Sequence, residues 1–565
     1  MKKIWKVRET SPRLQRALSE VLGLTPLFAQ LLVNRGIKTP EKAQAFLFGG
    51  LADCSDPFLL KDMDCAVTRI KTAIEKKEKI LIYGDYDVDG VTSTALLVDV
   101  FSELGARHET FIPNRLEEGY GLNMNAVALA ADNGVKLLIT VDCGINSADE
   151  VAFAKTRGID VIITDHHEVK ESWRRPDACA VVDPHQSDCP YPFKYLAGVG
   201  VAYKLARALM KGSEHIADRH LDLVALGTIA DVAPLNGENR ILVRCGLRTL
   251  RKTEKLGLKA LADVAGVEQR KLNAKHVGFA LGPRINAMGR VGSANTALEL
   301  MMCDDPTEAV RIARLLNSEN KKRQVIEKDI FKEAAARVRK EVDLEKTKII
   351  VLADDAWHVG VIGIVASRLA EEFLKPTILI VTKDGKGKGS GRGVEGFNLF
   401  EAINRASAYL VDFGGHEAAC GIRIMTENVA LFTEKLNTVA EECFAPEDKP
   451  APEMEIDLQL PFSHVGKKLV RELNLLTPYG PGNAEPVFST GDIEVKNVPR
   501  DIGRSGFKFL VTCGNLTCEA LTFRKNSVTR PKKGDVIDLA YTPSVNSWNG
   551  VDTIQMNIHD LRIAE

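Results

Sequence analysis

The chain has 565 residues, of which 45% are hydrophobic and 27% charged, and its formal net charge is −1. This composition is ordinary for a folded globular protein and excludes a collagen-like or strongly disordered chain. At ~100–200 residues per domain, the length predicts about three to five domains.

The near-neutral charge neither indicates nor excludes a nucleic-acid partner, because acidic metal sites can offset a basic groove in the total. The cysteines are scattered without a Cys-x-x-Cys pair, and no apolar run reaches the 18 residues of a membrane span. The N-terminal residues also lack the apolar stretch of a secretory signal. We therefore expect reduced thiols and a cytoplasmic location.

Residues 1–50 predict an N-terminal segment of short helices and loops. From about residue 78, Val/Ile/Leu-rich runs alternate with amphipathic segments such as "TSTALLVDVFSELG". Apolar strands alternating with helices predict a parallel sheet covered on both faces. We expect this α/β domain to occupy residues 51–250.

Acidic residues and histidines follow four of the expected strands. The carboxyl ends of parallel strands meet at one edge of a sheet, where ligands bind. A chance surface loop would not explain several strands that end in the same way. We therefore expect a single site at this edge. The residues concerned are Asp85, Asp87, Asp89, Asp142, Asp165, His166 and His167, with Asp183 as a further candidate.

The stretch "DYDVDG" at 85–90 also matches the start of an EF-hand calcium loop. That loop needs a bidentate Glu at its twelfth position, where this chain has Leu96. The residues before Asp85 moreover predict a buried strand rather than a helix. We exclude an EF-hand, which leaves a solvated acidic turn as the alternative for this stretch taken alone.

Clustered carboxylates without nearby basic residues require cations. Oxygen ligands suit Mg²⁺ or Mn²⁺, and an imidazole shifts the preference toward transition metals. Two ions ~3.5–4 Å apart would stabilise both the attacking and the leaving oxygen at phosphorus. Zinc is less favoured, because there is no His-Glu-x-x-His motif and Cys143 is the nearest thiol in sequence.

The second half of the chain predicts three further parts. Residues 251–345 form a connector, with "GPRINAMGR" too irregular for a simple helix and one long charged helix over 305–341. Residues 346–447 predict a second α/β domain. Residues 452–565 are strand-rich with two hairpin signals, which predicts an OB-fold-like, nucleic-acid-binding barrel.

Four motifs, "DYDVDG", "DCG", "DHH" and "GTIADVAPL", resemble in order and spacing those of the DHH phosphoesterase superfamily. "GSGRG" and "GGHEAACG" resemble its companion DHHA1 domain, and "IPNRLEEGYGL", "GPRINAMGR" and "WHVGVIGIVASRL" resemble its bacterial single-stranded-DNA-specific exonucleases. The resemblance implies an α/β fold: a DHH domain with a parallel sheet, a long connecting helix, a DHHA1 domain and an OB-fold-like β-barrel. It implies 5′→3′ cleavage that releases 5′-mononucleotides, in DNA recombination and repair.

By motif position, the resemblance also implies a two-ion site for Mn²⁺ or Mg²⁺, with Asp142 as the bridging ligand. Related pyrophosphatases place a histidine slightly upstream of Asp85, where this chain has Tyr83. His167 is expected to contact the scissile phosphate as hydrogen-bond donor or proton source, and Asp165 to orient a neighbouring histidine. The expected metal ligands are Asp85, Asp87, Asp89, Asp142, His166 and Asp231.

Substrate contacts are expected outside this cluster. Ser390, Arg392 and the backbone of "GSGRG" could form an anion-binding nest that, with Arg115, holds the terminal 5′ phosphate. Forked arginine donors suit other phosphate oxygens, and glycines near them allow a close approach. The remaining expected contacts are Arg284, Asn286, Arg290 and His416, with the role of His358 left open.

The aromatic residues of the barrel are candidates to stack on bases, although small barrels also need aromatic residues in their core. These candidates are Phe507, Phe509, Phe523 and Trp548.

The expected partners are single-stranded DNA with a 5′ end, a single-stranded-DNA-binding protein and a RecQ-type helicase, and we expect a monomer. Two alternatives stay open at this point. One is a phosphatase acting on short oligonucleotides, cyclic dinucleotides or pyrophosphate, against which the "GPRINAMGR" region and the barrel argue. The other is a DNA-binding scaffold that does not cut, against which the complete set of Asp and His residues argues.

Overall fold

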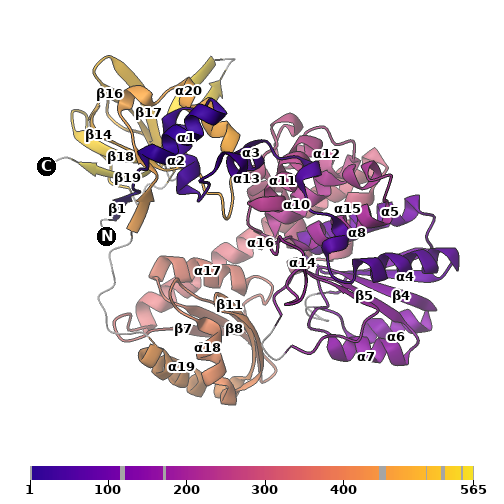
Figure 1. Ribbon diagram of the computed structural model, residues 1–565. Helices are drawn as coiled ribbons and strands as arrows, with labels where there is room; N and C mark the ends of the chain where they lie inside the picture. The colour runs from indigo at the N-terminus through magenta and orange to yellow at the C-terminus, as the bar shows by residue number, and fades with distance from the viewer. Residues whose placement is uncertain are drawn as a thin grey trace. The chain divides into compact units, whose positions relative to one another are not determined.

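The computed structural model describes residues 3–114, 121–169, 173–443, 453–503, 506–523, 528–548 and 551–563. The chain forms two compact units (Figure 1). The barrel unit comprises Met1–Asp56, Val232–Cys245 and Lys449–Glu565. The two-sheet unit comprises Pro57–Asp231 and Gly246–Asp448.

The first sheet of the two-sheet unit is parallel throughout, with strand order β3-β2-β4-β5-β6. Helices α6 and α7 cover one face, while α4, α5 and α8 lie on the other (Figure 1). The strands are almost completely buried because both faces are covered, which confirms the expected parallel sheet. The strands are β2 (Lys79–Gly84), β3 (His108–Phe111), β4 (Val135–Val141), β5 (Asp160–Thr164) and β6 (Ala180–Val182). The helices are α4 (Met63–Glu75), α5 (Val88–Glu103), α6 (Met124–Asp132), α7 (Ala148–Thr156), α8 (Gly198–Leu209), α9 (His215–Asp218) and α10 (Leu221–Ala230).

The connector is helical over most of its length, contrary to the irregular structure expected for "GPRINAMGR". That motif forms α14 (Gly282–Val291), preceded by a π-helical turn over Val277–Leu281. Pro283 is tolerated because it lies in the first turn of α14, and Gly289 because a neighbouring backbone approaches it closely. The expected long helix is α16 (Pro306–Glu341). The other helices of the connector are α12 (Leu256–Val264), α13 (Ala274–His276) and α15 (Ala294–Met302), and α11 (Gly237–Leu250) precedes it.

The second sheet has the order β10-β11-β9-β8-β7, with only the β7–β8 pair parallel. Helix α17 covers one face and α18 and α19 the other (Figure 1). The strands are β7 (Ile350–Asp354), β8 (Thr377–Lys383), β9 (Lys386–Arg392), β10 (Leu410–His416) and β11 (Ala419–Met425). The helices are α17 (Ile362–Phe373), α18 (Leu399–Arg405) and α19 (Val429–Cys443).

The barrel closes through the successive pairs β14–β16, β16–β17, β17–β19, β19–β18 and β18–β14. The β16–β17 hairpin turns at Gly514–Asn515, as expected, with Cys513 paired to Leu516. Five closed strands in this order form an OB-fold, so the expected architecture is confirmed. The strands are β12 (Glu453–Ile456), β13 (Leu458–Gln459), β14 (Phe488–Val495), β15 (Arg500–Ile502), β16 (Gly506–Cys513), β17 (Leu516–Thr522), β18 (Val536–Trp548) and β19 (Val551–Ile563), and α20 spans Lys467–Leu473.

The N-terminal segment packs onto this barrel. Strand β1 pairs with β12, and Leu18, Phe28 and Leu32 join the hydrophobic core of the barrel. This burial explains why the first 50 residues are ordered as helices rather than as an extended tail. The elements are β1 (Ile4–Val7), α1 (Pro12–Leu22), α2 (Pro26–Asn34) and α3 (Pro40–Phe48).

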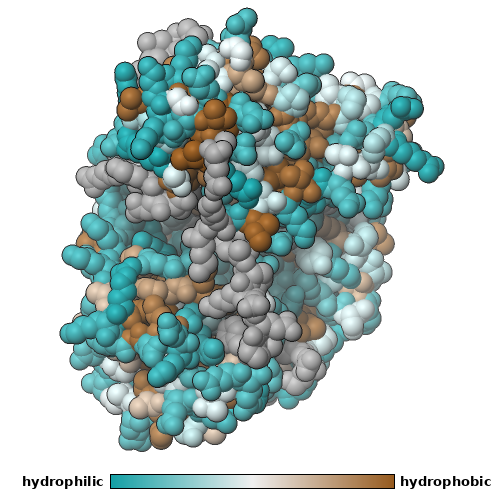
Figure 2. Space-filling view, turned by 90° about the vertical axis from the view of Figure 1, so that its left-hand side faces the viewer, coloured by the Kyte–Doolittle hydropathy of each residue, from teal (hydrophilic) through white to brown (hydrophobic). Residues whose placement is uncertain are grey.

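The surface facing the viewer in Figure 2 is mostly hydrophilic, with small separate hydrophobic patches. Patches of this kind are normal for a folded protein surface. Among the described residues, no single helix has the length and apolarity to cross a membrane, and only the bent pair α1–α2 reaches them jointly.

Candidate active site

Backbone hydrogen bonds hold Asp87 and Asp89, two carboxylates of the turn between β2 and α5, in place. Asp87 caps α5, because its Oδ1 accepts from the amides of Asp89 (2.8 Å) and Gly90 (3.2 Å). Asp89 is buried, and its two oxygens accept from the first amides of α8, those of Gly198 and Val199. A carboxylate has further lone pairs, so both residues can still bind a cation.

Asp142 follows β4 in a left-handed backbone conformation, with φ at +61°. Its amide donates to the Thr164 carbonyl at 3.0 Å, which ties the turn to β5. A Cβ on Gly198 would lie 2.7 Å from the Asp142 carboxylate, so the start of α8 can approach only as glycine. A conformation uncommon for aspartate is thus maintained by its surroundings, as at many functional sites.

His166 brings a nitrogen into the same cluster. Its Nε2 lies 3.1 Å from Asp142 Oδ1, 3.8 Å from Asp89 Oδ2 and 4.0 Å from Asp231 Oδ2. Within the described chain, both His166 Nε2 and Asp142 Oδ1 are buried without a hydrogen-bond partner. Two buried, unsatisfied ligand atoms at this separation fit a shared cation, because a cation satisfies both at once.

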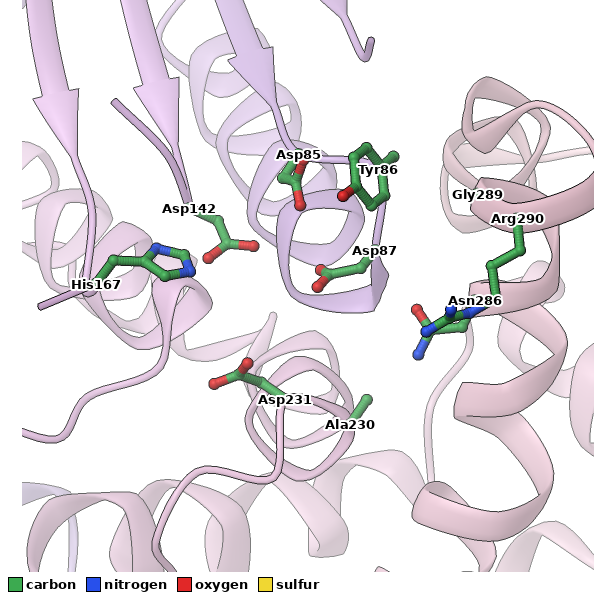
Figure 3. A pocket seen from close by; sticks show the side chains of 10 residues that line it. All are labelled: Asp85, Tyr86, Asp87, Asp142, His167, Ala230, Asp231, Asn286, Gly289 and Arg290. Atoms are coloured by element: carbon green, nitrogen blue, oxygen red, sulfur yellow. The ribbon is translucent and has the colours of Figure 1, made fainter. Parts of the chain in front are cut away.

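The expected ligands form overlapping groups whose ligand atoms lie within 4.8 Å of one another. Asp142 belongs to two of them, in keeping with a bridging position. The groups are Asp85–Asp87–Asp142, Asp89–His166–Asp231 and Asp142–His166–His167. A cavity of about 260 Å³ opens beside them, and the carboxylates of Asp85, Asp87, Asp142 and Asp231 point into one space (Figure 3).

Burial and crowding raise the proton affinity of two of these carboxylates, Asp142 and Asp231. Burial, then repulsion from Asp89, Asp87 and other acids, raises the pKa of Asp142 well above its ordinary value. Burial and the charges of Asp89 and Asp87 raise the pKa of Asp231 to about 9. Burial also lowers the pKa of His166 to about 3, so its ring is neutral and able to ligate a metal. The cluster has the charge and donor set of a divalent metal site.

Asp165 binds neighbouring groups of the protein. Its Oδ1 accepts from the amide of His166 and lies 2.7 Å from His167 Nδ1, and its Oδ2 accepts from the Ile145 amide. Burial alone would raise the pKa of Asp165, but the charge and hydrogen bond of His167 outweigh it and lower the pKa to about 2. Burial opposes protonation of His167, but Asp165 raises its pKa to about 9. The geometry matches an aspartate that orients a histidine.

Asp183 also follows a strand, but it belongs to none of these metal-binding groups. It is fully buried after β6, and its Oδ1 accepts from the His185 amide at 2.6 Å. Its position at the edge strand of the sheet places it beyond Asp165 rather than in the cavity.

Helix α14 forms the opposite wall of the cavity. Asn286 and Arg290 line it, and Gly289 permits contact because a Cβ there would lie 2.5 Å from the Tyr86 carbonyl oxygen. Asn286 Oδ1 accepts from the Val88 amide, so one end of its amide is already used. Arg284 does not line the cavity and donates to Asn317 and the Ala280 carbonyl.

Ser390 and Arg392, two of the residues expected to bind a terminal phosphate, lie at the N-terminus of α17. A Cβ on Gly363 would lie 2.8 Å from Ser390 Oγ and 3.1 Å from an Arg392 nitrogen. The expected backbone nest is wrong, because "GSGRG" lies in β9 and its backbone pairs with β8 and β11. At the start of α17 the amides of Ile362, Ile364 and Val365 already donate to the carbonyls of His358 and Val361, so the side chains of Ser390 and Arg392 are the candidate anion-binding groups.

Helix α14 connects the N-terminus of α17, with Ser390 and Arg392, to the cavity. Gly360 packs on the Arg290 carbonyl, and its own carbonyl accepts from Arg290 at 3.2 Å. His358 accepts from the Gly360 amide just before α17. The order of groups is therefore the metal cluster, α14, and then the N-terminus of α17.

His416 is exposed at the end of β10, in the same cross-strand row as Ala419 and Arg392. Directly paired residues share a face, so His416 and Arg392 project on the same side of the second sheet. Arg115 and the side chain of Trp548 lie outside the described residues. In the barrel, Phe507 and Phe509 belong to the core, whereas Phe523 is exposed.

Two features of the cavity were not predicted. Tyr86 and Ala230 line it, although neither carries a distinctive sequence signal. Phe279, in the π-helical turn before α14, is 84% exposed, unusually high for an aromatic side chain. A Cβ on Gly278 beside it would lie 3.8 Å from Ile229 Cγ2, next to the cavity-lining Ala230.

Comparison with family models matches three parts of the chain. Residues 79–228 match the N-terminal domain of the DHH family, residues 346–442 the DHHA1 domain and residues 456–560 the RecJ OB domain. The first two matches coincide with the two sheets of one unit, and the third with the barrel.

Individual relatives agree with these matches. The chain is 40% identical to the single-stranded-DNA-specific exonuclease RecJ of Bacillus subtilis over 99% of this chain and 71% of that protein. Crystal structures of RecJ from Thermus thermophilus in complex with Mn²⁺ and with Mg²⁺ superpose with TM-scores of 0.84 and 0.78. Their sequences are 31% and 30% identical to this chain, and the matches cover all of it and 80% and 79% of theirs.

Proposed function

Since the chain belongs to the RecJ family of single-stranded-DNA-specific exonucleases, we propose that it hydrolyses single-stranded DNA from the 5′ end and releases 5′-mononucleotides. It does so with two Mn²⁺ or Mg²⁺ ions, and its biological setting is DNA recombination and repair. The single observation that carries this proposal is the set of three overlapping groups of possible metal ligands, two of which share Asp142 and two of which share His166.

The residues that hold the two ions are divided between the groups. Asp85, Asp87 and Asp142 would hold one ion, and Asp89, His166 and Asp231, with Asp142 beside them, would hold the other. Ions bound there supply Lewis acidity to the scissile phosphate and lower the pKa of the attacking water. The close contacts at Gly198 and Gly289 keep these ligands in position.

The remaining cavity residues act on the phosphodiester itself. His167, held by Asp165 through Nδ1, presents its other nitrogen to the scissile phosphate or the leaving oxygen. Arg290 and the free end of the Asn286 amide face it from α14 and bind the phosphate oxygens. Opposed walls of this kind fix the phosphate between the donors and the ions.

The N-terminus of α17 sets the polarity. Ser390 and Arg392 bind the terminal 5′ phosphate together with Arg115, and His416 contacts the nucleotide. A charged phosphate near a helix N-terminus is also favoured by the helix dipole. A strand held by its 5′ phosphate presents the next phosphodiester to the cavity.

The barrel binds the rest of the strand, with Phe523 exposed for stacking. An enzyme that needs a free single-stranded end depends on proteins that supply it. We therefore include a single-stranded-DNA-binding protein and a RecQ-type helicase as partners of the monomer, in the reducing cytoplasm. The ten cysteines whose side chains are described carry no disulfide, as that compartment requires.

The test is digestion of a long 5′-phosphorylated single strand labelled at either end, with Mn²⁺, Mg²⁺ or EDTA. We expect early release of the 5′ label as a mononucleotide, only with metal, and no digestion of a blunt duplex. Asp142→Ala should bind the strand without cutting it. Intact DNA together with rapid hydrolysis of a dinucleotide or of pyrophosphate would overturn the proposed substrate.

A further inference from the structure

His358, in the turn between β7 and α17, has no role in the function proposed above. The same turn contains Gly360, whose backbone contacts the wall of the cavity. A Cβ on Gly360 would lie 2.4 Å from the Arg290 carbonyl oxygen and 3.2 Å from His358 Cε1. The imidazole and the backbone of the cavity-lining Arg290 therefore pack around one point. All of these residues belong to the two-sheet unit.

The other end of this turn leads to the residues proposed to bind the terminal phosphate. Helix α17 begins at Ile362, and Gly363 in its first turn packs on Ser390 and Arg392. The contact with α14 and the contact with β9 are thus only three residues apart in the chain. The turn that carries the imidazole bridges the cavity wall and the proposed phosphate site.

A backbone hydrogen bond fixes which nitrogen of His358 carries the proton. The Gly360 amide donates to His358 Nδ1 at 3.1 Å, so Nδ1 is an acceptor and the hydrogen of the neutral ring lies on Nε2. Burial lowers the pKa of His358, which keeps the ring neutral at neutral pH. His416, which is expected to contact the nucleotide, is held in the same way, because its Nδ1 accepts from the Ala418 amide at 3.3 Å.

The Nε2–H group of His358 is a donor that the protein itself does not use. Within the described part of the chain it has no acceptor, and it is not enclosed. The acid at the end of β7, Asp354, already accepts from Arg337 at 3.1 Å and from the Ala356 amide at 2.9 Å. An open donor between two proposed phosphate contacts is suited to an oxygen of the substrate, and phosphate oxygens accept most hydrogen bonds that proteins make to DNA.

We propose that His358 is a substrate-binding residue whose Nε2–H donates to an oxygen of the terminal 5′ phosphate, beside Ser390 and Arg392. Arg392 supplies the positive charge, and the neutral imidazole adds a hydrogen bond of fixed direction. Together they favour a strand that ends in a phosphate over one that ends in a hydroxyl. This inference rests on the proposed 5′-phosphate site and adds a residue to it.

Two amide side chains each reproduce one half of the imidazole and so separate a role in binding from a role in the turn. In His358→Asn, the side-chain oxygen can accept from the Gly360 amide, as in an Asx turn, but no donor reaches the position of Nε2. In His358→Gln, the longer side chain can place its NH₂ group near that position but gives up the short bond to Gly360. A purely structural residue would tolerate Asn and not Gln, whereas the proposed donor tolerates Gln and not Asn.

The experiment measures binding of the full chain, in EDTA, to a single strand labelled at its 3′ end. Fluorescence anisotropy gives the dissociation constants for a 5′ phosphate and a 5′ hydroxyl, and their ratio isolates the terminal phosphate. We expect His358→Asn to reduce the parental preference for the phosphate about tenfold, as for the loss of one hydrogen bond to a charged group, and His358→Gln to keep most of it. Asp355→Asn is the matched control, because Asp355 is exposed in the same turn, and it should keep the parental ratio.

The outcomes separate this inference from the proposed function. A parental ratio in His358→Asn, or equal weakening for both 5′ ends, would overturn the role of His358 alone. If the parent and Arg392→Ala both bind the two ends alike, the proposed phosphate site itself fails. Should His358→Asn not fold, nitrogen-15 NMR of the parent's histidines decides: the His358 Nε2 signal should shift with the 5′-phosphorylated strand and not with the 5′-hydroxyl strand, and equal shifts overturn the inference.

Discussion

Two proposed sites of this chain are built in different ways: the metal site at the carboxyl ends of the first sheet, called the metal edge below, and the phosphate site formed by Ser390, Arg392 and the N-terminus of α17, called the α17 end. The metal edge consists of buried, mutually repelling carboxylates on turns, one of them in a left-handed conformation. The α17 end consists of a regular strand, a helix N-terminus and side chains that already bond one another, such as Arg392 with Ser390. At the metal edge, carboxylates that repel one another lower the stability of the fold but offer ligands for metal ions. At the α17 end, the groups proposed to bind phosphate already satisfy one another without a ligand.

Loss of the bridging ligand should give the largest effect on rate. Asp142→Asn removes the charge that both ions share, and the several kcal/mol that the ions supply correspond to about 10³-fold or more in kcat. Quench-flow digestion of 5′-phosphorylated single-stranded DNA at saturating Mn²⁺ measures it. Asp183→Asn is the control, because Asp183 is buried at the end of another strand but outside the cavity. Equal losses of kcat in the two variants would show that the effect is not specific to the metal edge.

The same variant should raise stability when metal is absent. The pKa of Asp142 is raised by burial and by its acidic neighbours, so an uncompensated charge there destabilises the fold. In EDTA at neutral pH, Asp142→Asn should therefore have a higher Tm than the parent. Its free energy of unfolding should be larger by about 1–3 kcal/mol. Saturating Mn²⁺ should reverse the order, since only the parent gains both ions. Calorimetry in both conditions decides, and a lower Tm in EDTA would contradict the picture of a strained edge.

Asp165 tests whether orientation matters as much as ligation. Asp165→Asn keeps the shape but removes the charge that holds His167 Nδ1, so His167 should lose its fixed tautomer. The expected loss in kcat is about 10²–10⁴-fold, the range of general acid–base contributions, with Mn²⁺ affinity little changed. Rapid-mixing assays together with Mn²⁺ titration separate the two quantities. Weakened Mn²⁺ binding at parental kcat would make Asp165 part of the metal site instead.

Much of this contrast could be predicted from sequence. Aspartates at strand ends, the order of the motifs and the long helix over 306–341 are readable because a parallel sheet gathers its strand ends at one edge. Two elements could not be predicted: the helix at "GPRINAMGR" and the strand at "GSGRG". The glycines in both allow close packing, whereas glycine in a sequence usually indicates a turn. Nor does periodicity reveal that residues 232–245 leave the first domain to pack on the barrel, because their partners lie some 200 residues away in both directions.

The phosphate-binding end should respond to the substrate rather than to the metal. Arg392→Ala removes a charge-assisted contact to the terminal phosphate worth about 1.5–3 kcal/mol, roughly 10–100-fold in KM. The loss should vanish on substrates with a 5′ hydroxyl, while the Mn²⁺ requirement stays parental. Lys388→Ala is the control, because Lys388 lies on the same strand two residues before Ser390. An equal loss on both kinds of 5′ end would place Arg392 elsewhere along the strand.

Substitution of Phe279 should give the smallest effect, a change in the affinity for single-stranded DNA. Phe279 belongs neither to the metal edge nor to the α17 end. An aromatic ring that is 84% exposed in an ordered turn next to the cavity wall offers a face to a nucleobase. Stacking of one base contributes about 1–3 kcal/mol, and the low end applies to so open a position, so Phe279→Ala should weaken single-strand binding roughly fivefold. Phe279→Trp should retain the affinity, whereas Phe279→Leu should not, because an aliphatic side chain of similar hydrophobicity has no flat π-face. Fluorescence anisotropy in EDTA measures all three, and equal affinities for Leu and Trp would show that apolar contact, not stacking, is what the residue provides.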